Sequence, residues 1–391
     1  EPYLRAFDIK GRTLLPKDVR RTPVYNEQTQ HIESMESRYP TEVTLEGEAF
    51  GKPLSCTRRL LENNVPEDND AELRAIGKTF QQQCEAQEQT LLPALAYYGT
   101  QRIWVDSSLL QNFERSLTER TVGYEECLEP SSSYNSFGTW FEHLTKAALE
   151  EVQQSAALQR NLLIKEAIQK AVDMCLESTG LHDLYYNFKL KCFVVSHPLT
   201  GEMIVDDLSD GFRSVISMVA DLAYRMVRLN PQLGERAVLE TPGLVLIDEI
   251  DMHLHPLWQQ TVLLDLQKAF PKVQFIVTTH SPQVLSSVPA TSIRVLSWGK
   301  QFEGVRRVDF SLGADSTRIL QEIQHVDPRP QCLPVVQDLK RYLELVSEDK
   351  WDTEEALALR KRLDDWARGR EPALVRADMD IRMREFRRRR S

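Results

Sequence analysis

Hydrophobic and polar positions alternate with two different periods along residues 206–300, where the pattern of the chain is clearest. Apolar residues recur every three or four positions over residues 212–229 and 257–270, which predicts two amphipathic helices. Between and after these helices lie unbroken apolar runs of strand length. The runs cover residues 243–247, 273–279 and 293–298. Strands that alternate with helices of this length are typical of a parallel sheet, so the pattern predicts an α/β fold.

Weaker patterns flank this region on both sides. A short apolar run closed by a glycine, residues 91–99, predicts a buried strand that enters a loop. Three- or four-residue steps over residues 139–175 predict one long helix or a pair of helices. Residues 185–205 predict a β-hairpin. Two further helical patterns, at about 334–348 and 354–368, predict a helical hairpin near the carboxyl end of the chain.

The first 90 residues are polar and show little regular periodicity. We expect an irregular segment there, with a small extended patch at residues 43–45 and a solvated helix within residues 64–90. We expect the chain as a whole to divide into four parts. Residues 1–138 form the remainder of an amino-terminal lobe with an insertion, and residues 139–180 form a helical insertion. Residues 181–332 form a carboxyl-terminal lobe, and residues 333–391 form a helical hairpin with a basic tail.

Composition limits the class of protein. The chain has 391 residues, 41% of them hydrophobic, and a formal net charge of -10, which excludes a disordered tail protein or a generally basic DNA-coating protein. Its six cysteines form no CxxC pair, which indicates reduced thiols and not a disulfide framework or a zinc knuckle. No apolar run approaches the roughly 18–20 residues that span a bilayer. We therefore expect a cytoplasmic protein without a membrane partner.

The strongest chemical signal is the pair Asp248 and Glu249, which directly follows the apolar run 244–247. Open α/β sheets bind ligands at the carboxyl ends of their strands. In nucleotide hydrolysis the first carboxylate can hold Mg²⁺ and the second can orient or deprotonate the attacking water. Taken alone, the two residues fit two interpretations equally well: a nucleotide site, or a buried strand that ends at two surface acids.

Two other segments could contact phosphate. Ser209 is a good N-cap for the helix that follows it, and Gly211 would let the backbone approach an anion at the positive end of that helix. His280 stands at the tip of the next predicted strand, where it could contact a terminal phosphate. An ordinary capped helix and a structural histidine are the alternatives. His253 and His255 lack a third ligand at a useful spacing, which argues against zinc.

Taken in order, these elements resemble the head of ABC-type ATPases: signature motif, Walker B strand, D-loop and H-loop. The resemblance covers about residues 206–300 and implies a P-loop NTPase-type parallel sheet with a helical insertion, and ATP and Mg²⁺ as cofactors. In that family two heads enclose two ATP molecules between them. The implied roles are nucleotide contact across the dimer for Ser209 and Gly211, the Mg²⁺ shell for Asp248, the lytic water for Glu249, the dimer contact for Asp251 and the γ-phosphate for His280.

The phosphate loop of such an ATPase, GxxxxGK[ST], occurs nowhere in the 391 residues. Gly77, Lys78 and Thr79 match its last three positions, but Glu72 stands where the first glycine belongs. In the SMC-like and overcoming-lysogenization-like ATPases this loop lies near the amino terminus, before a segment similar to residues 2–7. We expect the native chain to start several dozen residues earlier. A degenerate head that does not hydrolyse nucleotide is the rival explanation.

Longer segments resemble the stand-alone prokaryotic ATPases of the Septu type, PtuA, including those associated with retrons. This resemblance implies a homodimer or a higher even oligomer, an HNH nuclease partner of the PtuB kind, and DNA or a retron reverse transcriptase with its msDNA as further partners. Tyr98 and Gln101 would lie where a Q-loop strand ends, which makes Gln101 a candidate nucleotide contact. The segments that carry the resemblance to the Septu-type ATPases are residues 94–104, 250–258, 313–320 and 375–379.

The chain shows no nuclease constellation of its own, since its single Asp-x-Asp, Asp378 to Asp380, lies in the charged tail. Residues 376–391 hold seven arginines and three acids, which could meet nucleic-acid phosphates, an acidic partner surface or only solvent. The leading hypothesis is an ATPase that dimerises around ATP and regulates an HNH nuclease in bacterial anti-phage defence. The alternatives are an SMC-like ATPase of DNA repair or DNA clamping, and a scaffold that binds nucleotide without hydrolysing it.

Overall fold

The computed structural model comprises two compact units, residues 1–287 and 288–391. No helix in the described part of the chain combines the length and the hydrophobicity needed to cross a bilayer. The structure describes residues 2–7, 9, 14–26, 31–49, 51–62, 65–86, 89–100, 120–129, 141, 142, 144–148, 160–298 and 302–388.

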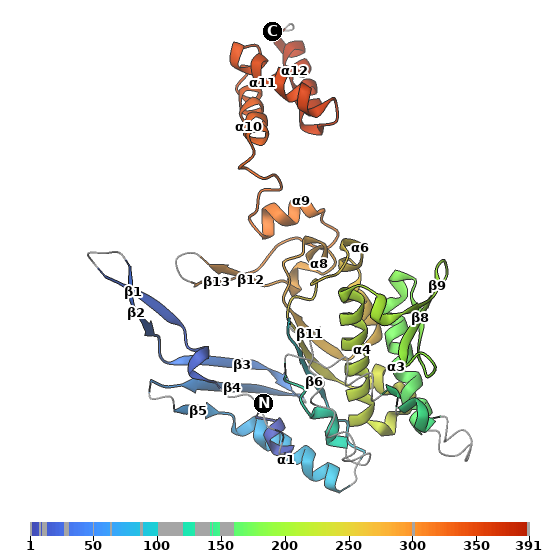
Figure 1. Ribbon diagram of the computed structural model, residues 1–391. Helices are drawn as coiled ribbons and strands as arrows, with labels where there is room; N and C mark the ends of the chain where they lie inside the picture. The colour runs from blue at the N-terminus through green and yellow to red at the C-terminus, as the bar shows by residue number, and fades with distance from the viewer. Residues whose placement is uncertain are drawn as a thin grey trace. The chain divides into compact units, whose positions relative to one another are not determined.

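A parallel three-stranded sheet forms the centre of the first unit (Figure 1). Its strands are β6 (Ala94–Tyr98), β10 (Gly243–Ile247) and β11 (Val273–Val277), in the order β11-β10-β6. All three are paired in register, so that Tyr98, Ile247 and Val277 end the sheet at one edge. The predicted α/β fold with a parallel sheet is thus confirmed.

Helix α4 (Asp210–Leu229) packs against the sheet beside β6. Apolar side chains lie on most faces of this helix, so nearly the whole helix is buried, and Val219, Leu222 and Met226 are at most 1% exposed. Alternate residues of the strands point to this side, where Val245 is fully buried. The next residue in β10, Leu246, points to the other face and is 37% exposed.

A buried polar network joins α4 to the sheet. Tyr98 donates a hydrogen bond of 2.8 Å to Asp221, and Arg225 donates to the same carboxylate oxygen at 2.8 Å. Arg225 also donates to the carbonyl oxygens of Gly123 and Glu125, at 3.1 and 2.7 Å. Burial, followed by the charge of Asp221, raises the pKa of the Tyr98 phenol, which therefore stays a donor. The network fixes β6, α4 and the 3-10 helix Arg120–Tyr124 against one another.

A second layer lies beside α4. Helix α3 (Arg160–Leu176) packs on α4 and on α7 (Val262–Ala269), next to the antiparallel sheet of β7 (His182–Asn187), β8 (Cys192–His197) and β9 (Gly201–Ile204) (Figure 1). The predicted hairpin is present as β8 and β9.

The first arm of the predicted hairpin contains two strands, β7 and β8, and not one. The side chain of Asn187 accepts hydrogen bonds from the backbone N–H groups of Lys189 and Leu190, at 3.0 and 3.1 Å. Such an Asx turn reverses the chain, with Lys191 at a φ of 54°. Local turn chemistry thus separates β7 from β8.

The amino-terminal part contains more strand than its sequence predicts. Antiparallel strands precede helix α1 (Ala71–Glu85), the helix expected within residues 64–90. Four of the five strands are mostly exposed, so they leave little alternation of apolar and polar side chains that would reveal them, whereas the strand over residues 52–60 buries Leu54, Cys56 and Leu60. The strands are β1 (Arg21–Tyr25), β2 (Ile32–Ser37), β3 (Thr41–Ala49), β4 (Lys52–Leu60) and β5 (Pro66–Asn69).

Two predicted elements around residues 257–298 differ in the structure. The expected helix over residues 257–270 is divided into α6 (Pro256–Gln259) and α7, with Thr261 at a φ of -115° between them. The expected third parallel strand, β12 (Val295–Trp298), pairs antiparallel with β13 (Phe302–Arg306) in the second unit. Its apolar run predicts a strand correctly but does not specify the partner strand.

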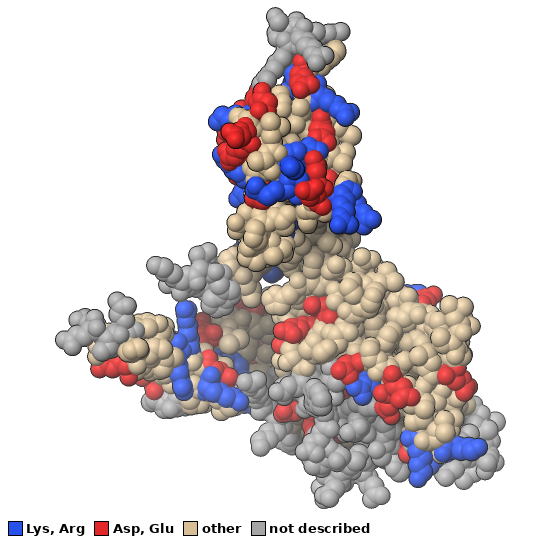
Figure 2. Space-filling view, turned by 45° about the horizontal axis from the view of Figure 1, so that its top comes forward, with Lys and Arg blue, Asp and Glu red and all other residues tan. Residues whose placement is uncertain are grey.

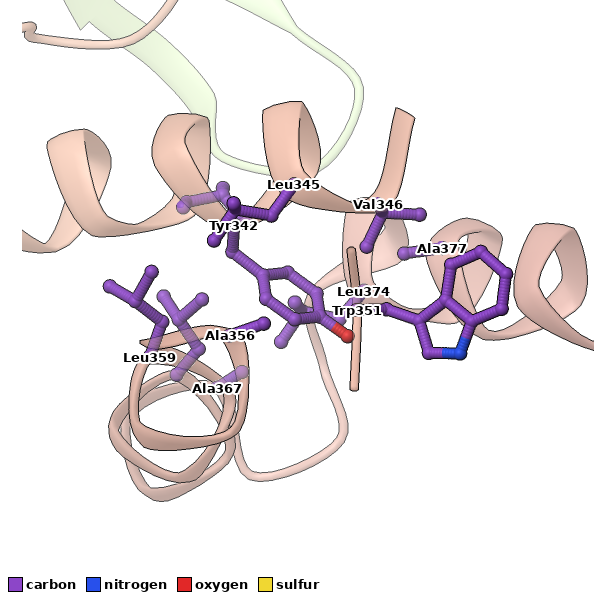
Figure 3. Close-up of a cluster of buried hydrophobic side chains, with 11 residues drawn as sticks. Tyr342, Leu345, Val346, Trp351, Ala356, Leu359, Ala367, Leu374 and Ala377 are labelled. Atoms are coloured by element: carbon purple, nitrogen blue, oxygen red, sulfur yellow. The ribbon is translucent and has the colours of Figure 1, made fainter. Parts of the chain in front are cut away.

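The second unit ends in three helices that share an apolar core (Figure 3). The predicted hairpin corresponds to α10 (Pro334–Ser347) and α11 (Glu354–Ala367), and the expected basic tail is a third helix, α12 (Pro372–Arg388). Core side chains from all three helices and from the α10–α11 loop meet, among them Leu339, Tyr342, Trp351, Leu363 and Leu374. The hydrogen-bonded ion pair of Glu371 with Arg329 lowers the pKa of Glu371 and anchors the start of α12.

We predict that Arg225→Met lowers the free energy of unfolding by about 3 kcal/mol, because it leaves the mostly buried carboxylate of Asp221 without its cation. Urea titration measures the effect. The matched control is Arg236→Met, which removes an exposed ion pair with Glu240 and should cost less than about 1 kcal/mol. Equal losses in the two variants would show that the buried network does not stabilise the sheet.

Candidate functional site

The carboxyl ends of β10 and β11 bring polar side chains to one edge of the parallel sheet. Asp248 is the first residue after β10, and its backbone N–H donates to the carbonyl oxygen of Tyr98 at 2.8 Å. Thr278 is the first residue after β11, and its N–H donates to the carbonyl oxygen of Ile247 at 3.0 Å. The hydrogen bonds between the strands therefore continue up to the first residues of the site. They fix the position of the Asp248 backbone at the edge of the sheet.

Thr278 connects the two predicted carboxylate residues. Its hydroxyl donates a hydrogen bond to Oδ1 of Asp248 and accepts one from the backbone N–H of Glu249 at 2.8 Å. Glu249 has a φ of 47°, an unusual conformation for a residue other than glycine. Such strain costs on the order of 1–3 kcal/mol and occurs most often at functional sites. The threonine holds Glu249 in this turn and orients Asp248 beside it.

The segment after Glu249 is attached to the segment after β11 by a second set of contacts. The hydroxyl of Thr279 donates to Oδ1 of Asp251. The side-chain amide of Gln259 donates to the carbonyl oxygens of Asp251 and Leu254, at 3.4 and 2.9 Å. Ser281 donates to the other end of that amide at 2.7 Å, and its oxygen also caps helix α8 (Pro282–Ser286). Asp251 is thus held in place from two sides.

The start of α4 lies against this same segment. Ser209 is the exposed N-cap of the helix, and its side chain makes no capping hydrogen bond. A Cβ atom on Gly211 would lie 2.4 Å from the carbonyl oxygen of His253, so only glycine permits this approach. The rings of Phe212 and Trp258 stack with their centroids 4.6 Å apart. Two motifs separated by about 40 residues in sequence are therefore in contact.

The structure brings together Ser209, Gly211, Asp248, Glu249 and Asp251 through these contacts. His280 follows Thr279 and is exposed. Gln101 lies outside the described residues.

Thr278, Thr279 and Gln259 complete the site but were not predicted. Thr278 and Thr279 could have been noticed, because they directly precede His280 at the end of an apolar run. No sequence signal identifies Gln259.

The site fits a magnesium ion only as part of a nucleotide complex. Within the described residues, no group of three or more His, Cys, Asp or Glu side chains could hold a metal ion. Mg²⁺ that accompanies a nucleotide usually takes only one or two protein carboxylates, with water and phosphate oxygens as its other ligands. Asp248 and Glu249 match this requirement in number and chemistry.

Comparison with known sequences agrees with the motifs. Residues 141–286 match a family described as "AAA domain, putative AbiEii toxin, Type IV TA system". The chain is 37% identical over 177 residues, 45% of its length, to the Retron Ec83 probable ATPase of Escherichia coli. It is 27% identical over 292 residues, 64% of its length, to the Retron Vc95 probable ATPase of Vibrio cholerae. Over 92 residues, 24% of its length, it is 41% identical to the Septu protein PtuA of Bacillus mycoides.

These similarities confirm the predicted resemblance to retron and Septu ATPases. They cover 32%, 56% and 12% of the three relatives, so the chain spans about half or less of each. Among solved structures, the SMC head domain from Thermotoga maritima aligns with a TM-score of 0.37 at 12% identity, over 73% of this chain and 82% of that one.

We predict that Gly211→Ala lowers the free energy of unfolding by about 1–3 kcal/mol, because the added methyl group must displace the backbone at His253. Hydrogen exchange of residues 250–254 should become faster in the same variant. Gly47→Ala is the control, since no heavy atom lies within 4 Å of its added Cβ. The predicted contact is wrong if Gly211→Ala matches the control in both measurements.

Proposed function

We propose that this protein is an ABC-type ATPase that dimerises around ATP and regulates a partner HNH nuclease in bacterial anti-phage defence. The observation that carries the proposal is the arrangement of Asp248 and Glu249 at the end of a central parallel strand, both bonded to Thr278. The similarity to retron and Septu ATPases supports the same activity.

Each residue of the edge has a role in the proposed hydrolysis. Asp248 holds the Mg²⁺ shell, and its bond from Thr278 fixes the direction of its carboxylate. Glu249 orients the attacking water and accepts its proton. His280 contacts the γ-phosphate. When bound, Mg²⁺ neutralises the charge that develops on the phosphate oxygens.

The parallel sheet has a place for the phosphate loop that such an ATPase requires. Among the described residues, β11 pairs only with β10, so its other edge is open to a further strand. A parallel strand added there would end at the same edge as β10 and β11, and its loop would reach the phosphates beside Asp248.

The start of α4 is proposed to bind the nucleotide of a second protomer. The first N–H groups of a helix have no partners within the helix, and together with the helix dipole they attract phosphate. Ser209 is exposed at this end, and Gly211 contacts the segment that carries Asp251. Two copies facing each other would close two sites, which makes an even number of protomers. Asp251 lies in the segment proposed to contact the second copy.

The proposed partners are those that the resemblance to Septu and retron ATPases implies. The Septu similarity supports an HNH nuclease of the PtuB kind, and the retron similarity supports DNA or a reverse transcriptase with its msDNA. We propose that the ATP-bound dimer restrains the nuclease and that loss of ATP releases it, in the cytoplasm. A neighbouring gene for a nuclease or a reverse transcriptase would separate this function from an SMC-like ATPase of DNA repair.

We predict that Glu249→Gln, introduced into the native protein, lowers ATP turnover by at least about 100-fold and leaves ATP binding intact, because the amide cannot accept the proton of the water. Phosphate release and nucleotide affinity measure the two effects. Glu240→Gln, an exposed residue paired with Arg236, is the control with unchanged turnover. Unchanged turnover in Glu249→Gln would overturn its role, and a wild type that binds ATP without turnover would favour the scaffold.

A further inference from the structure

Helix α12 presents an apolar stripe to solvent. Val375, Met379, Met383 and Phe386 are 45%, 60%, 57% and 57% exposed. They are spaced by four, four and three residues, which places them on one face of the helix. The stripe covers about 16 Å, or three turns, at the rise of about 1.5 Å per residue of an α-helix.

The core of the second unit does not require this stripe. Leu374 and Ala377, at 4% and 3% exposure, pack into the three-helix core from the opposite face of α12, and Ile381 lies against that core. Contiguous apolar side chains on a surface mark interaction sites, and methionine is frequent where a surface adapts to a partner.

Positive charge borders the stripe on both sides. At 100° per residue, Arg382 lies about 60° from the centre of the stripe on one side, and Arg376 and Arg387 lie about 60° to 80° from it on the other. All three arginines are exposed. Figure 2 shows Lys and Arg side chains among the acidic ones on the helical bundle.

The acidic residues of α12 are farther from the stripe. Asp378, Asp380 and Glu385 lie about 100° to 120° from its centre. Asp378 accepts hydrogen bonds from Arg360 on α11, which lower its pKa and keep it charged and engaged away from the stripe. The charge next to the apolar side chains is therefore positive.

We propose that this stripe, Val375, Met379, Met383 and Phe386 with its bordering arginines, binds an acidic amphipathic helix of another protein. The proposal does not depend on the ATPase activity. A helix of about 12 residues or more, apolar on one face and rich in Glu or Asp beside it, would match the length and charge of the stripe.

Charge and shape argue against other occupants. A second copy of α12 would bring arginines against arginines, which disfavours self-pairing. Nucleic acid would pair its phosphates with the arginines but would leave four apolar side chains without a matching surface. A lipid surface favours a broad apolar face, whereas this stripe spans only about 80° of the helix.

The test uses the 391-residue chain and a fluorescent 18-residue model peptide with leucine at positions i, i+4, i+7 and i+11 and glutamate beside them. Fluorescence anisotropy should show binding at least 10-fold tighter than that of the same peptide with lysine in place of glutamate. Met379→Gln/Met383→Gln should weaken binding at least 10-fold, and Arg376→Gln/Arg382→Gln at least 5-fold. The control is Leu357→Gln, which removes an exposed apolar side chain on α11. This variant should bind the glutamate peptide as tightly as the unchanged chain does.

Circular dichroism must show the same helix content in all variants. The proposal fails if the lysine peptide binds as tightly as the glutamate peptide or if neither binds. It also fails if a 20-base-pair DNA duplex or vesicles of phosphatidylcholine and phosphatidylglycerol bind in a way that Met379→Gln/Met383→Gln abolishes. A concentration-dependent dimer in sedimentation velocity that the same variant abolishes would assign the stripe to self-association and would also overturn the proposal.

Discussion

The pairing of β6, β10 and β11 in one parallel register is the constraint on which the site depends. Because Tyr98, Ile247 and Val277 are opposite one another, the residues that follow them emerge at the same edge. A shift of one residue would turn every side chain of a strand to the opposite face. Buried Val245 and Ile247 and the bond from Tyr98 to Asp221 oppose such a shift. The core of the sheet therefore determines where the carboxylates lie.

Three residues convert this edge into a defined arrangement. Thr278 holds both Asp248 and the strained turn at Glu249, and Thr279 holds Asp251. Gly211 brings the start of α4 against His253. Local strain in the turn is balanced by hydrogen bonds from the neighbouring strand, which is the usual arrangement where a site requires fixed geometry. The apolar stripe of α12 belongs to a separate unit and shares no residue with this edge.

The sequence predicts those parts of the structure whose burial leaves a pattern. The apolar runs of β10 and β11 and the periodicity of α4 are such parts, and the carboxylates after β10 are visible because they directly follow the apolar run. The mostly exposed strands β1, β2, β3 and β5 leave little such pattern. The bond from Thr278 to Asp248 depends on strand order, which a single sequence does not specify. The same reason explains β12, whose apolar run fits a parallel strand as well as its actual antiparallel pair.

A structure of the native protein with Mg²⁺ and a slowly hydrolysed ATP analogue would decide most directly whether this edge is a nucleotide site. We expect Mg²⁺ next to Asp248, directly or through one water, and the γ-phosphate within hydrogen-bond distance of His280. The start of α4 from a second copy, with Ser209, should lie against the same nucleotide. A nucleotide bound elsewhere, with Asp248 and Glu249 remote from its phosphates, would contradict the proposed function.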